Sequence, residues 1–518
     1  MRGEKLIRKR LILFTGCAMT ALGGCATTHE AGPRPLDVAR LPAVGIVSER
    51  FLSYNVEMLE LTGGRFWKPY ASTNSAKTDL YEDRPPIDLT NPRLRALARA
   101  LGPAYVRYSG TWANGTFFAD SETAPATVPK GYDAVLTRRQ WRQAVEFARD
   151  SDAQIVTSMP TSPGARDADG NWTPQAAERL FAYTQSIGGT IAASEFANEP
   201  NLIGGTKPPA NYDAGRYRGD FARFHEWLRK RSPGTLILAP GAFELGKGST
   251  FPSFIKKLPT ADVAPTAAHR PDAVSFHFYG ALSQRCNGLK DIDPQSDTWL
   301  STIDTAIADT AALRDAISPD APLWLTETAD AACGGNPQAK TFADSFRFVD
   351  QLARAARQGV QVVMHNTLAA SDYALLDEHD FAPRPNYWAA YLWRRTMGTT
   401  VLDGGSIVRG DGLRIYAHCQ RGRSGGVTVL AINPDRANAR TLHIAGRAEV
   451  FSLTQPEGRP GSAALNGVVL ELGQASGAKD IFPRMEALLR RGGVTVPASS
   501  ISFITIPDAA NPSCMVKG

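Results

Sequence analysis

The stretch PQAAERLFAYTQSIGGTIAASEFANEPN, residues 174–201, contains one complete unit of the pattern that decides the fold. Its first half, Pro174–Ile187, has a helical pattern of apolar residues, which ends at two glycines. Thr190–Phe196 is a short apolar run of the kind that forms a buried strand. The polar residues 198–201 (NEPN) follow directly. A helix, a strand and a polar strand end are the parts of a βα repeat.

The same alternation repeats along residues 51–366. Eight short β-rich runs are present: Phe51–Met58, Ala104–Ser109, Gln154–Met159, Thr190–Phe196, Leu236–Ala239, Ala273–Tyr279, Leu323–Thr326 and Gln361–Asn366. Helical patterns lie between them, including Arg93–Leu101, Arg138–Asp150, Tyr217–Lys230, Ser301–Ala316 and Ala339–Arg357. Eight consecutive βα units predict a closed (β/α)8 barrel of the TIM type over residues 51–397. The alternative is an open, doubly wound sheet, but no Gly-rich phosphate-binding turn follows the first run.

The pattern changes near Gly398, where Gly-rich turns begin to separate short strands. These are Leu413–His418, Val427–Ile432, Thr441–Ile444, Ala448–Leu453, Gly467–Leu472 and Ser500–Thr505. Their spacing is typical of an antiparallel β-sandwich. We therefore predict the α/β fold class, with a barrel followed by a C-terminal β-sandwich domain over residues 398–518. The strand Ala43–Val47, within residues 43–50, is expected to join that sandwich.

The N-terminus has the features of an export signal. Basic residues at positions 2, 5, 8, 9 and 10 precede the apolar run Leu11–Leu22, which is too short to span a bilayer as a mature helix. The run ends in LGGC at residues 22–25, which resembles a bacterial lipoprotein cleavage box. We expect residues 1–25 to be a lipoprotein signal peptide, Cys25 to carry the lipid, and the Pro-rich residues 26–42 to form a tether. A plain signal peptide and an uncleaved anchor are the alternatives. The expected location is the bacterial periplasm or cell surface.

Charge and cysteine content exclude some classes of function. The chain has a formal charge of +6, and its signal segment contributes about +4 of it, so the remainder is close to neutral. This balance does not favour nucleic-acid binding. Outside the signal, Cys286, Cys333, Cys419 and Cys514 could form disulfides after export, in any of three pairings. No CxxC or His-rich spacing is present, and we expect no metal and no cofactor.

Two carboxylates are predicted at the mouth of the barrel, because active sites of such barrels lie at the carboxyl ends of the strands. The fourth strand is followed by Asn198 and Glu199, and the seventh ends at Glu327. The sixth strand adds His277 and Tyr279. Cleavage of a glycosidic bond needs one carboxyl group to protonate the leaving oxygen and a second to attack carbon or activate water. The pattern therefore predicts a glycoside hydrolase that uses both glutamates.

Each of these residues also has a structural interpretation. A single Glu at a strand end is usually a solvated or salt-bridged loop residue, and Asn and Pro favour turns for local reasons. His277 could be a hydrogen-bonded core histidine, and Tyr279 could pack in the barrel wall. The enzyme is favoured because Asn-Glu-Pro after the fourth strand and Glu327 on the seventh occur together in a chain of eight βα units.

From about Phe51 to Cys514 the sequence resembles glycoside hydrolase family 79, the heparanases and β-glucuronidases. The resemblance is carried by residues 51–53 (FLS), 94–111 (LRALARALGPAYVRYSGT), 194–201 (SEFANEPN), 274–279 (VSFHFY), 323–335 (LWLTETADAACGG), 360–366 (VQVVMHN) and 372–388. It implies a retaining enzyme with Glu199 as the acid/base and Glu327 as the nucleophile.

The resemblance also implies a set of substrate-binding residues. Asn198 would bind the sugar 2-hydroxyl, and Tyr279 would form a hydrogen bond near the nucleophile. The glucuronate carboxylate would be held by the backbone of Gly334 and Gly335 and by the hydroxyl of Tyr373. The site would be completed by Glu57, Thr111 and His277. The family more often has Asp at position 57.

Two disulfides follow from the same resemblance. Cys419 and Cys514 match a family disulfide that ties the sandwich to the end of the chain. Cys286 and Cys333 lie on loops after the sixth and seventh strands, and we predict a second bridge between them, with two free thiols as the alternative. Cys333 stands where the family usually has a glycine.

The leading functional hypothesis is a retaining endo-β-glucuronidase of the heparanase type, which hydrolyses glucuronate-containing glycosaminoglycans such as heparan sulfate by double displacement. The alternatives are an exo-β-glucuronidase that releases terminal glucuronate and a surface lipoprotein that binds polysaccharide without cleaving it. Mammalian heparanases are cut into two chains by removal of a linker. This chain is short between Thr111 and Gln154, so we expect it to be active as a single chain. It also lacks the basic cluster that, by the resemblance, would bind sulfated polymer near that linker. The expected partners are a polysaccharide or oligosaccharide and, through the lipid, a membrane. We expect a monomer.

Overall fold

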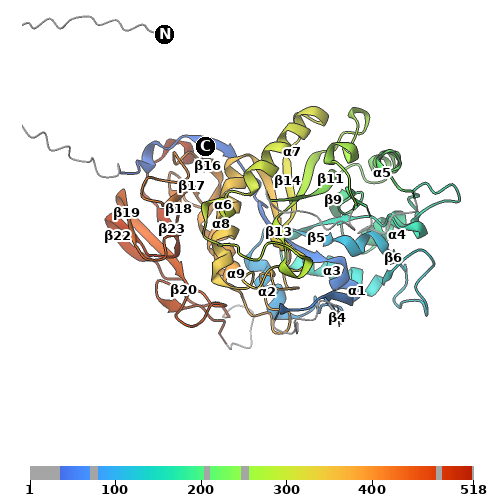
Figure 1. The fold of residues 1–518 in the computed structure, drawn as a ribbon, viewed down its shortest axis with the longest axis horizontal. Coiled ribbons are helices and arrows are strands. Elements are labelled where there is room, and N and C mark those ends of the chain that lie inside the picture. The colour runs from blue at the N-terminus through green and yellow to red at the C-terminus, as the bar shows by residue number, and fades with distance from the viewer. Residues whose placement is uncertain (1–34, 71–79, 204–210, 247–255, 474–480, 516–518) are drawn as a thin grey trace, which may run out of the picture. The chain divides into compact units, whose positions relative to one another are not determined.

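The computed structural model describes residues 35–70, 80–203, 211–246, 256–473 and 481–515. The predicted signal peptide, the lipidation site Cys25 and the first part of the tether lie outside these residues. Eight parallel strands close into a barrel in sequence order (Figure 1). They are β2 (Leu52–Glu57), β5 (Ala104–Ser109), β8 (Ala153–Ser158), β9 (Ile191–Glu195), β11 (Leu236–Leu245), β13 (Ala273–Leu282), β14 (Leu323–Ala332) and β15 (Val360–His365). The (β/α)8 fold class is confirmed, and every predicted run contributes a barrel strand.

Helices follow the strands, and some of them begin at a residue whose side chain caps the first turn. The main ones are α2 (Pro92–Ala100), α3 (Arg138–Asp150), α4 (Gln175–Ser186), α5 (Ala214–Arg231), α7 (Ile303–Ile317), α8 (Phe342–Arg357) and α9 (Pro385–Thr396). The side chain of Asn91 accepts from two N–H groups at the start of α2. Thr137 and Gln140 form a reciprocal capping box at the start of α3. These caps satisfy N–H groups that have no partner within the helix.

The barrel interior changes from apolar to polar along the strands. Near their beginnings, an apolar cluster draws one residue or more from seven strands: Tyr105, Val156, Ala193, Leu238, Ala273, Trp324, Val362 and Met364. Side chains two positions apart point to the same side of a strand. Arg107, Glu195, Thr326 and Asn366 therefore follow four of these residues into the interior, and all are buried. The polar layer lies towards the carboxyl ends, where the catalytic residues were predicted.

The C-terminal strands form one antiparallel sheet of nine strands. They are β1 (Ala43–Ile46), β16 (Met397–Leu402), β17 (Arg414–Gln420), β18 (Val427–Asn433), β23 (Ser500–Ile506), β19 (Arg440–Thr454), β20 (Ala464–Leu465), β21 (Val468–Val469) and β22 (Leu488–Val496). The long β19 pairs with β22 along residues 440–450 and with β23 along residues 449–454. Apolar residues of β17, β18 and β23 pack with those of β19 and β22 in one core. β19 thus joins β22 to the rest of the sheet.

Details of the sheet differ from the prediction. The strands predicted at Thr441–Ile444 and Ala448–Leu453 are one strand, because Gly446 (φ 90°) lies in a bulge of β19 and does not end it. Of Gly467–Leu472 only Val468–Val469 is a strand. β22 was not predicted, since its polar LLRRGG start lacks an alternating pattern. β1 pairs with β16, so the segment before the barrel and the segment after it lie side by side.

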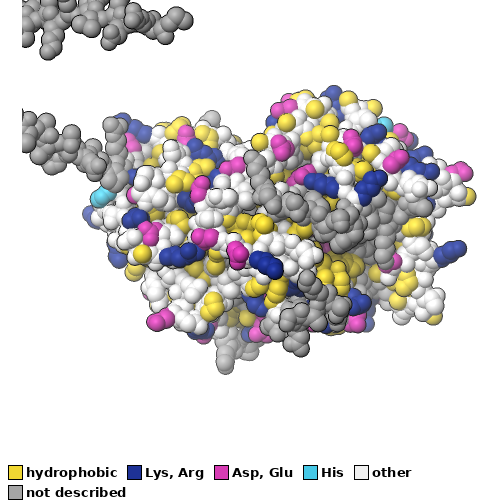
Figure 2. Space-filling model, in the orientation of Figure 1, with side chains coloured by type: hydrophobic (Ala, Val, Ile, Leu, Met, Phe, Trp, Pro, Cys, Tyr) yellow, Lys and Arg dark blue, Asp and Glu magenta, His cyan; other side chains and the backbone are white. Residues whose placement is uncertain are grey.

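The sheet contacts the barrel helices through buried polar groups. Tyr416 on β17 donates a 2.7 Å hydrogen bond to Asp350 on α8. Arg354 bonds the other carboxylate oxygen of Asp350 at 2.6 Å, and Arg414 lies 3.6 Å from the first. Elsewhere, positive and negative side chains are interspersed on the face that Figure 2 shows. In the described ranges, no helix is both long and apolar enough to cross a bilayer.

Candidate active site

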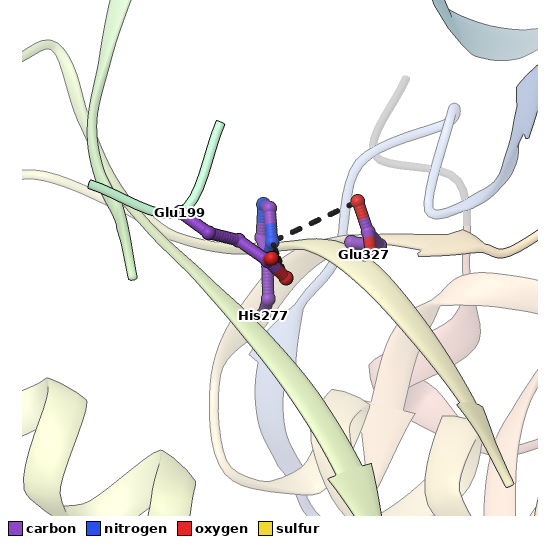
Figure 3. Close-up of side chains that lie close together, drawn as sticks. All are labelled: Glu199, His277 and Glu327. Atoms are coloured by element: carbon purple, nitrogen blue, oxygen red, sulfur yellow. Dashed lines mark hydrogen bonds and ion pairs between the residues drawn. The ribbon is translucent and has the colours of Figure 1, made fainter. Parts of the chain in front are cut away.

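The two predicted carboxylates meet at the barrel mouth. Glu199 lies four residues beyond the end of β9, with a left-handed backbone (φ 49°), and Glu327 lies within β14. His277 on β13 stands between them (Figure 3). A carboxylate oxygen of each glutamate and a ring nitrogen of His277 all lie within 4.8 Å of one another. The strands thus bring two residues 128 positions apart in sequence around one small volume.

Electrostatics distinguish the residues of this trio. Burial and the negative charge of Glu327 raise the pKa of Glu199 above its usual value of 4.5. The Nδ1 atom of His277 lies 3.1 Å from Glu199 and 3.7 Å from Glu327. Burial lowers the pKa of His277, but the charge of Glu327 and hydrogen bonds to Glu195 and Glu199 outweigh burial and raise it to about 9. The surroundings of His277 therefore favour its protonated form.

Both oxygens of Glu327 accept hydrogen bonds. Tyr279 donates to Oε1 at 2.7 Å, and Arg107 donates to Oε2 at 2.9 Å. Two such donors stabilise a negatively charged carboxylate. Glu327 therefore has the environment of an anion, whereas Glu199 has that of a carboxyl group that holds its proton. Opposite environments for two neighbouring carboxyl groups are the arrangement required for acid and nucleophile roles.

Arg107 was not predicted as a site residue, although it lies inside the quoted stretch 94–111. It is almost fully buried and contacts three functional side chains. Its guanidinium bonds Glu195 at 2.8 and 3.0 Å, Glu327 at 2.9 Å and the Oδ1 atom of Asn198 at 2.7 Å. Burial opposes ionisation of Glu195, but the charge of Arg107, the charge and hydrogen bond of His277 and the hydrogen bond from Thr326 together outweigh it. They hold the pKa of Glu195 well below its usual range. The guanidinium of Arg107 thus contacts residues on both the Glu199 side and the Glu327 side of the site.

Replacing Arg107 with Met is expected to destabilise the fold and slow the reaction. The substitution leaves Glu195 and Glu327 in the interior without their cation, a loss that typically costs about 3–5 kcal/mol. Urea unfolding monitored by tryptophan fluorescence measures the stability, and kcat with a nitrophenyl glycoside measures the reaction. Arg107→Lys keeps the charge but cannot make all the contacts, so its losses should be smaller. Equal stability of Arg107→Met and the wild type would contradict the assignment.

Asn198 is held in place by hydrogen bonds that leave its side-chain NH2 group free to bind a ligand. Its backbone N–H donates to Oδ1 of Asn114 at 2.9 Å, and its carbonyl accepts from Nδ2 of Asn114 at 3.0 Å. Its own Oδ1 accepts from Arg107, while Nδ2 is buried and has no acceptor among the described residues. A buried amide donor of this kind usually has a partner. A sugar hydroxyl between the two glutamates would supply one.

Asn366 connects the remaining polar groups of the site. Its Nδ2 atom lies 3.0 Å from the hydroxyl of Tyr279, 3.2 Å from that of Tyr373 and 3.1 Å from Oε1 of Glu57. The other Glu57 oxygen lies against Gly110, where a Cβ atom would come within 1.5 Å of it. Burial and the charge of Glu327 raise the pKa of Glu57 well above its usual value. Asn366 therefore joins Glu57, Tyr279 and Tyr373 in one hydrogen-bond network. Position 110, which lies against Glu57, has room only for glycine.

Thr111 and the Gly334–Gly335 turn complete the predicted set. Thr111 begins a short 3-10 helix after β5 and is half-buried. Gly335 lies against the ring of Tyr373, and its N–H donates to the carbonyl of Ala331 at 3.1 Å. The N–H groups of Cys333 and Gly334 have no acceptor in the part of the chain that the structure describes. The structure thus leaves the N–H groups of Cys333 and Gly334 available to a ligand, whereas that of Gly335 is used within the turn.

The arrangement of Glu199, His277 and Glu327 also has the composition of a metal site. Arg107 argues against that use, because its guanidinium is bonded to Glu327 and lies 3.2 Å from the ring of His277. A divalent ion at this point would be repelled by a fixed positive charge. Two carboxyl groups in opposite environments at the mouth of a (β/α)8 barrel define a glycoside hydrolase.

Comparisons with known proteins agree with this class and narrow it. The sequence model described as "Glycosyl hydrolase family 79, N-terminal domain" matches residues 87–353, just over half of the chain. The chain belongs to glycosyl hydrolase family 79. It is 26% identical over 496 residues to heparanase of Mus musculus, with 82% of this chain and 88% of the relative covered.

Two further relatives and one solved structure are also similar to this chain. Heparanase-like protein 1 of Arabidopsis thaliana is 27% identical, covering 70% of this chain and 68% of the relative. Hyaluronoglucuronidase of Hirudo nipponia is 24% identical, covering 83% and 92%. A 4-O-α-L-rhamnosyl-β-D-glucuronidase structure from Fusarium oxysporum has a TM-score of 0.62 at 15% identity, covering 90% of this chain and 99% of that one. This last likeness supports the fold.

Proposed function

We propose that this protein is a retaining endo-β-glucuronidase that cleaves glucuronate-containing glycosaminoglycan. The observation that carries the proposal is the approach of Glu199 and Glu327, whose nearest carboxylate oxygens lie within 4.8 Å. Retaining enzymes have carboxyl groups about 5–5.5 Å apart, whereas inverting enzymes need about 6.5–9.5 Å for a water molecule. The spacing favours direct attack by one carboxylate over attack by water.

In the proposed mechanism, Glu327 attacks the anomeric carbon and forms a covalent glycosyl-enzyme. Glu199 gives its proton to the departing oxygen in this first step, and a carboxyl group whose pKa is raised suits that role. In the second step Glu199 removes a proton from water, which displaces Glu327 with net retention of configuration. Tyr279 and Arg107 hold the carboxylate of Glu327 throughout the cycle.

The donors beside Glu327 support a carboxylate-bearing sugar. The N–H groups of Cys333 and Gly334 have no acceptor among the described residues, and the hydroxyl of Tyr373 lies 3.2 Å from Asn366. Backbone N–H and hydroxyl donors suit an anionic group. Relatives named heparanase and hyaluronoglucuronidase, each matched over more than four fifths of this chain, support a glycosaminoglycan as the source of that sugar.

Product analysis tests this proposal. The enzyme is incubated with heparan sulfate, with hyaluronan and with p-nitrophenyl β-glucuronide, and the products are separated by size. Shortening of a polymer without release of free glucuronate is the expected result. Release of monosaccharide from chain ends would instead support an exo-β-glucuronidase. Polysaccharide binding with no cleavage of any of the three substrates would refute the enzyme.

The proposed role of Glu199 predicts a pH dependence. With a polysaccharide, whose leaving group needs a proton, only the protonated form of Glu199 can start the reaction, so kcat/KM falls as pH rises through its pKa. Because burial and Glu327 raise that pKa, the decline should lie above pH 4.5. In Glu327→Gln the neighbouring charge is absent, and the pKa of Glu199 should fall. Carboxyl 13C NMR, with Glu199→Gln to identify the resonance, measures the pKa directly. An unchanged pKa in Glu327→Gln would contradict the electrostatic coupling.

A further inference from the structure

The turn after β14 has an unusual backbone. Cys333, Gly334 and Gly335 are consecutive residues with φ angles of 67°, 78° and 83°. Glycine adopts this left-handed region freely because it has no Cβ atom. A residue with a Cβ atom, such as Cys333, is disfavoured there. The position therefore needs an additional interaction to hold it in the observed conformation.

Hydrogen bonds hold the neighbours of Cys333 in place. Ser283 donates its N–H to the carbonyl of Ala332 at 3.0 Å and its hydroxyl to that of Gly335 at 2.6 Å. Asn336 donates its N–H to Asp330 at 3.1 Å. The backbone N–H and carbonyl of Cys333 form no hydrogen bond with any described residue. The facing loop after β13 is thus bonded to both flanks of the turn through Ser283, and to Cys333 itself through the disulfide with Cys286.

This turn contacts Tyr373, a member of the hydrogen-bond network that leads to Glu327. A Cβ atom on Gly335 would contact the ring of Tyr373 at 3.3 Å. Tyr373 is linked through Asn366 to Tyr279, which donates to Glu327. The N–H groups that remain available belong to Cys333 and Gly334, and their directions depend on the φ and ψ angles of residues 332–334.

We propose that the Cys286–Cys333 disulfide is a positioning element for substrate recognition. It holds Cys333 in the left-handed conformation, so that the N–H groups of Cys333 and Gly334 face the carboxylate of the bound sugar. The inference rests on the proposed β-glucuronidase function and adds a specificity-determining role to a bond that would otherwise serve stability alone. In this proposal Cys286 acts through the disulfide, and Cys333 acts through the conformation of its backbone. Neither side chain takes part in the bond-breaking steps.

Two double variants separate this role from a general loss of the crosslink. Cys286→Ser/Cys333→Gly lacks the disulfide but has a residue that adopts positive φ freely. Cys286→Ser/Cys333→Ala lacks the disulfide and retains a Cβ atom. KM and kcat are measured with p-nitrophenyl β-glucuronide and with p-nitrophenyl β-glucoside, which has no carboxylate. Thermal unfolding of each variant reports stability.

The glycine variant is expected to keep KM for the glucuronide within about twofold of the wild type. The alanine variant is expected to raise that KM by about five- to thirtyfold, the range that 1–2 kcal/mol corresponds to. Rates with the glucoside should not change, so discrimination between the two substrates falls in the alanine variant alone. Equal KM values in both variants and the wild type, or equal losses in both variants, would overturn the proposal.

A reductant provides a second measurement on the folded wild type, should the alanine variant fail to fold. Tris(2-carboxyethyl)phosphine reduces each disulfide to two thiols and is itself oxidised to the phosphine oxide. It should raise KM for the glucuronide in the wild type and leave the glycine variant unchanged, although both keep Cys419–Cys514. A similar rise in both would overturn the proposal. Absence of glucuronide turnover by the oxidised wild type would instead refute the β-glucuronidase function.

Discussion

Replacing Glu327 with Gln is expected to lower kcat by about four orders of magnitude or more, the scale seen when a catalytic unit loses its nucleophile. The amide has the same shape, so Tyr279 can still contact it and the substrate can still bind. It cannot attack the anomeric carbon, and no glycosyl-enzyme forms. Steady-state rates with p-nitrophenyl β-glucuronide measure the effect. Thermal unfolding should show that the fold persists.

A matched substitution away from the mouth provides the control. Glu178 on α4 is paired with Arg231 on the outer surface, at 2.6 Å, and Glu178→Gln should retain wild-type kcat. Glu327→Ala with added azide provides a second check, since a small anion can replace the missing carboxylate and yield a glycosyl azide of inverted configuration. Residual activity of Glu327→Gln within tenfold of the wild type would remove the nucleophile assignment.

Replacing Glu199 with Gln is expected to have an effect that depends on the leaving group. Polysaccharide cleavage should fall by about 10²–10⁴-fold, because a sugar alkoxide departs poorly without a proton from a general acid. Nitrophenolate departs without that proton, so the first step with p-nitrophenyl β-glucuronide should be nearly normal. The second step then lacks its base, and the glycosyl-enzyme should accumulate. Mass spectrometry detects it as an added glucuronyl mass, and the burst of nitrophenolate gives its rate.

The substrate comparison makes this second prediction specific. Azide needs no general base, and it should restore turnover of the nitrophenyl substrate while giving a glycosyl azide of retained configuration. The same anion should not restore polymer cleavage. Equal losses on both substrates, with no burst and no rescue by azide, would show that Glu199 is not the acid/base.

The sequence was sufficient to predict the barrel because its strands are short, apolar and regularly alternated with helices. Each of the eight predicted runs lies in the barrel, and the residues at their ends meet because parallel strands end on one face. The approach of Glu199 to Glu327 follows from that topology. The sheet was harder to predict, since a bulge at Gly446 and the polar start of β22 do not show an alternating pattern.

The supporting residues of the site could not be found in the same way. Arg107 lies on a strand whose pattern looks like that of any buried strand, and only the three-dimensional layer places it beside Glu195 and Asn198. Asn114 and Asn366 are ordinary loop and strand-end residues in sequence. The position of the available backbone donors, at Cys333 and Gly334, depends on three φ angles that no residue pattern specifies. The predicted lipid at Cys25 stays a prediction.

The pairing of β1 with β16 has a consequence for the integrity of the chain. The polypeptide enters the barrel from β1 of the sheet and leaves it into the neighbouring strand β16. The barrel is therefore closed by the hydrogen bonds between its eight strands, and the segments before and after it are also held together by the β1–β16 pair. A peptide-bond cleavage in a surface loop of the barrel would leave each fragment with its own strand in the shared sheet. The fragments would remain at high effective concentration, which favours reassembly of the ring.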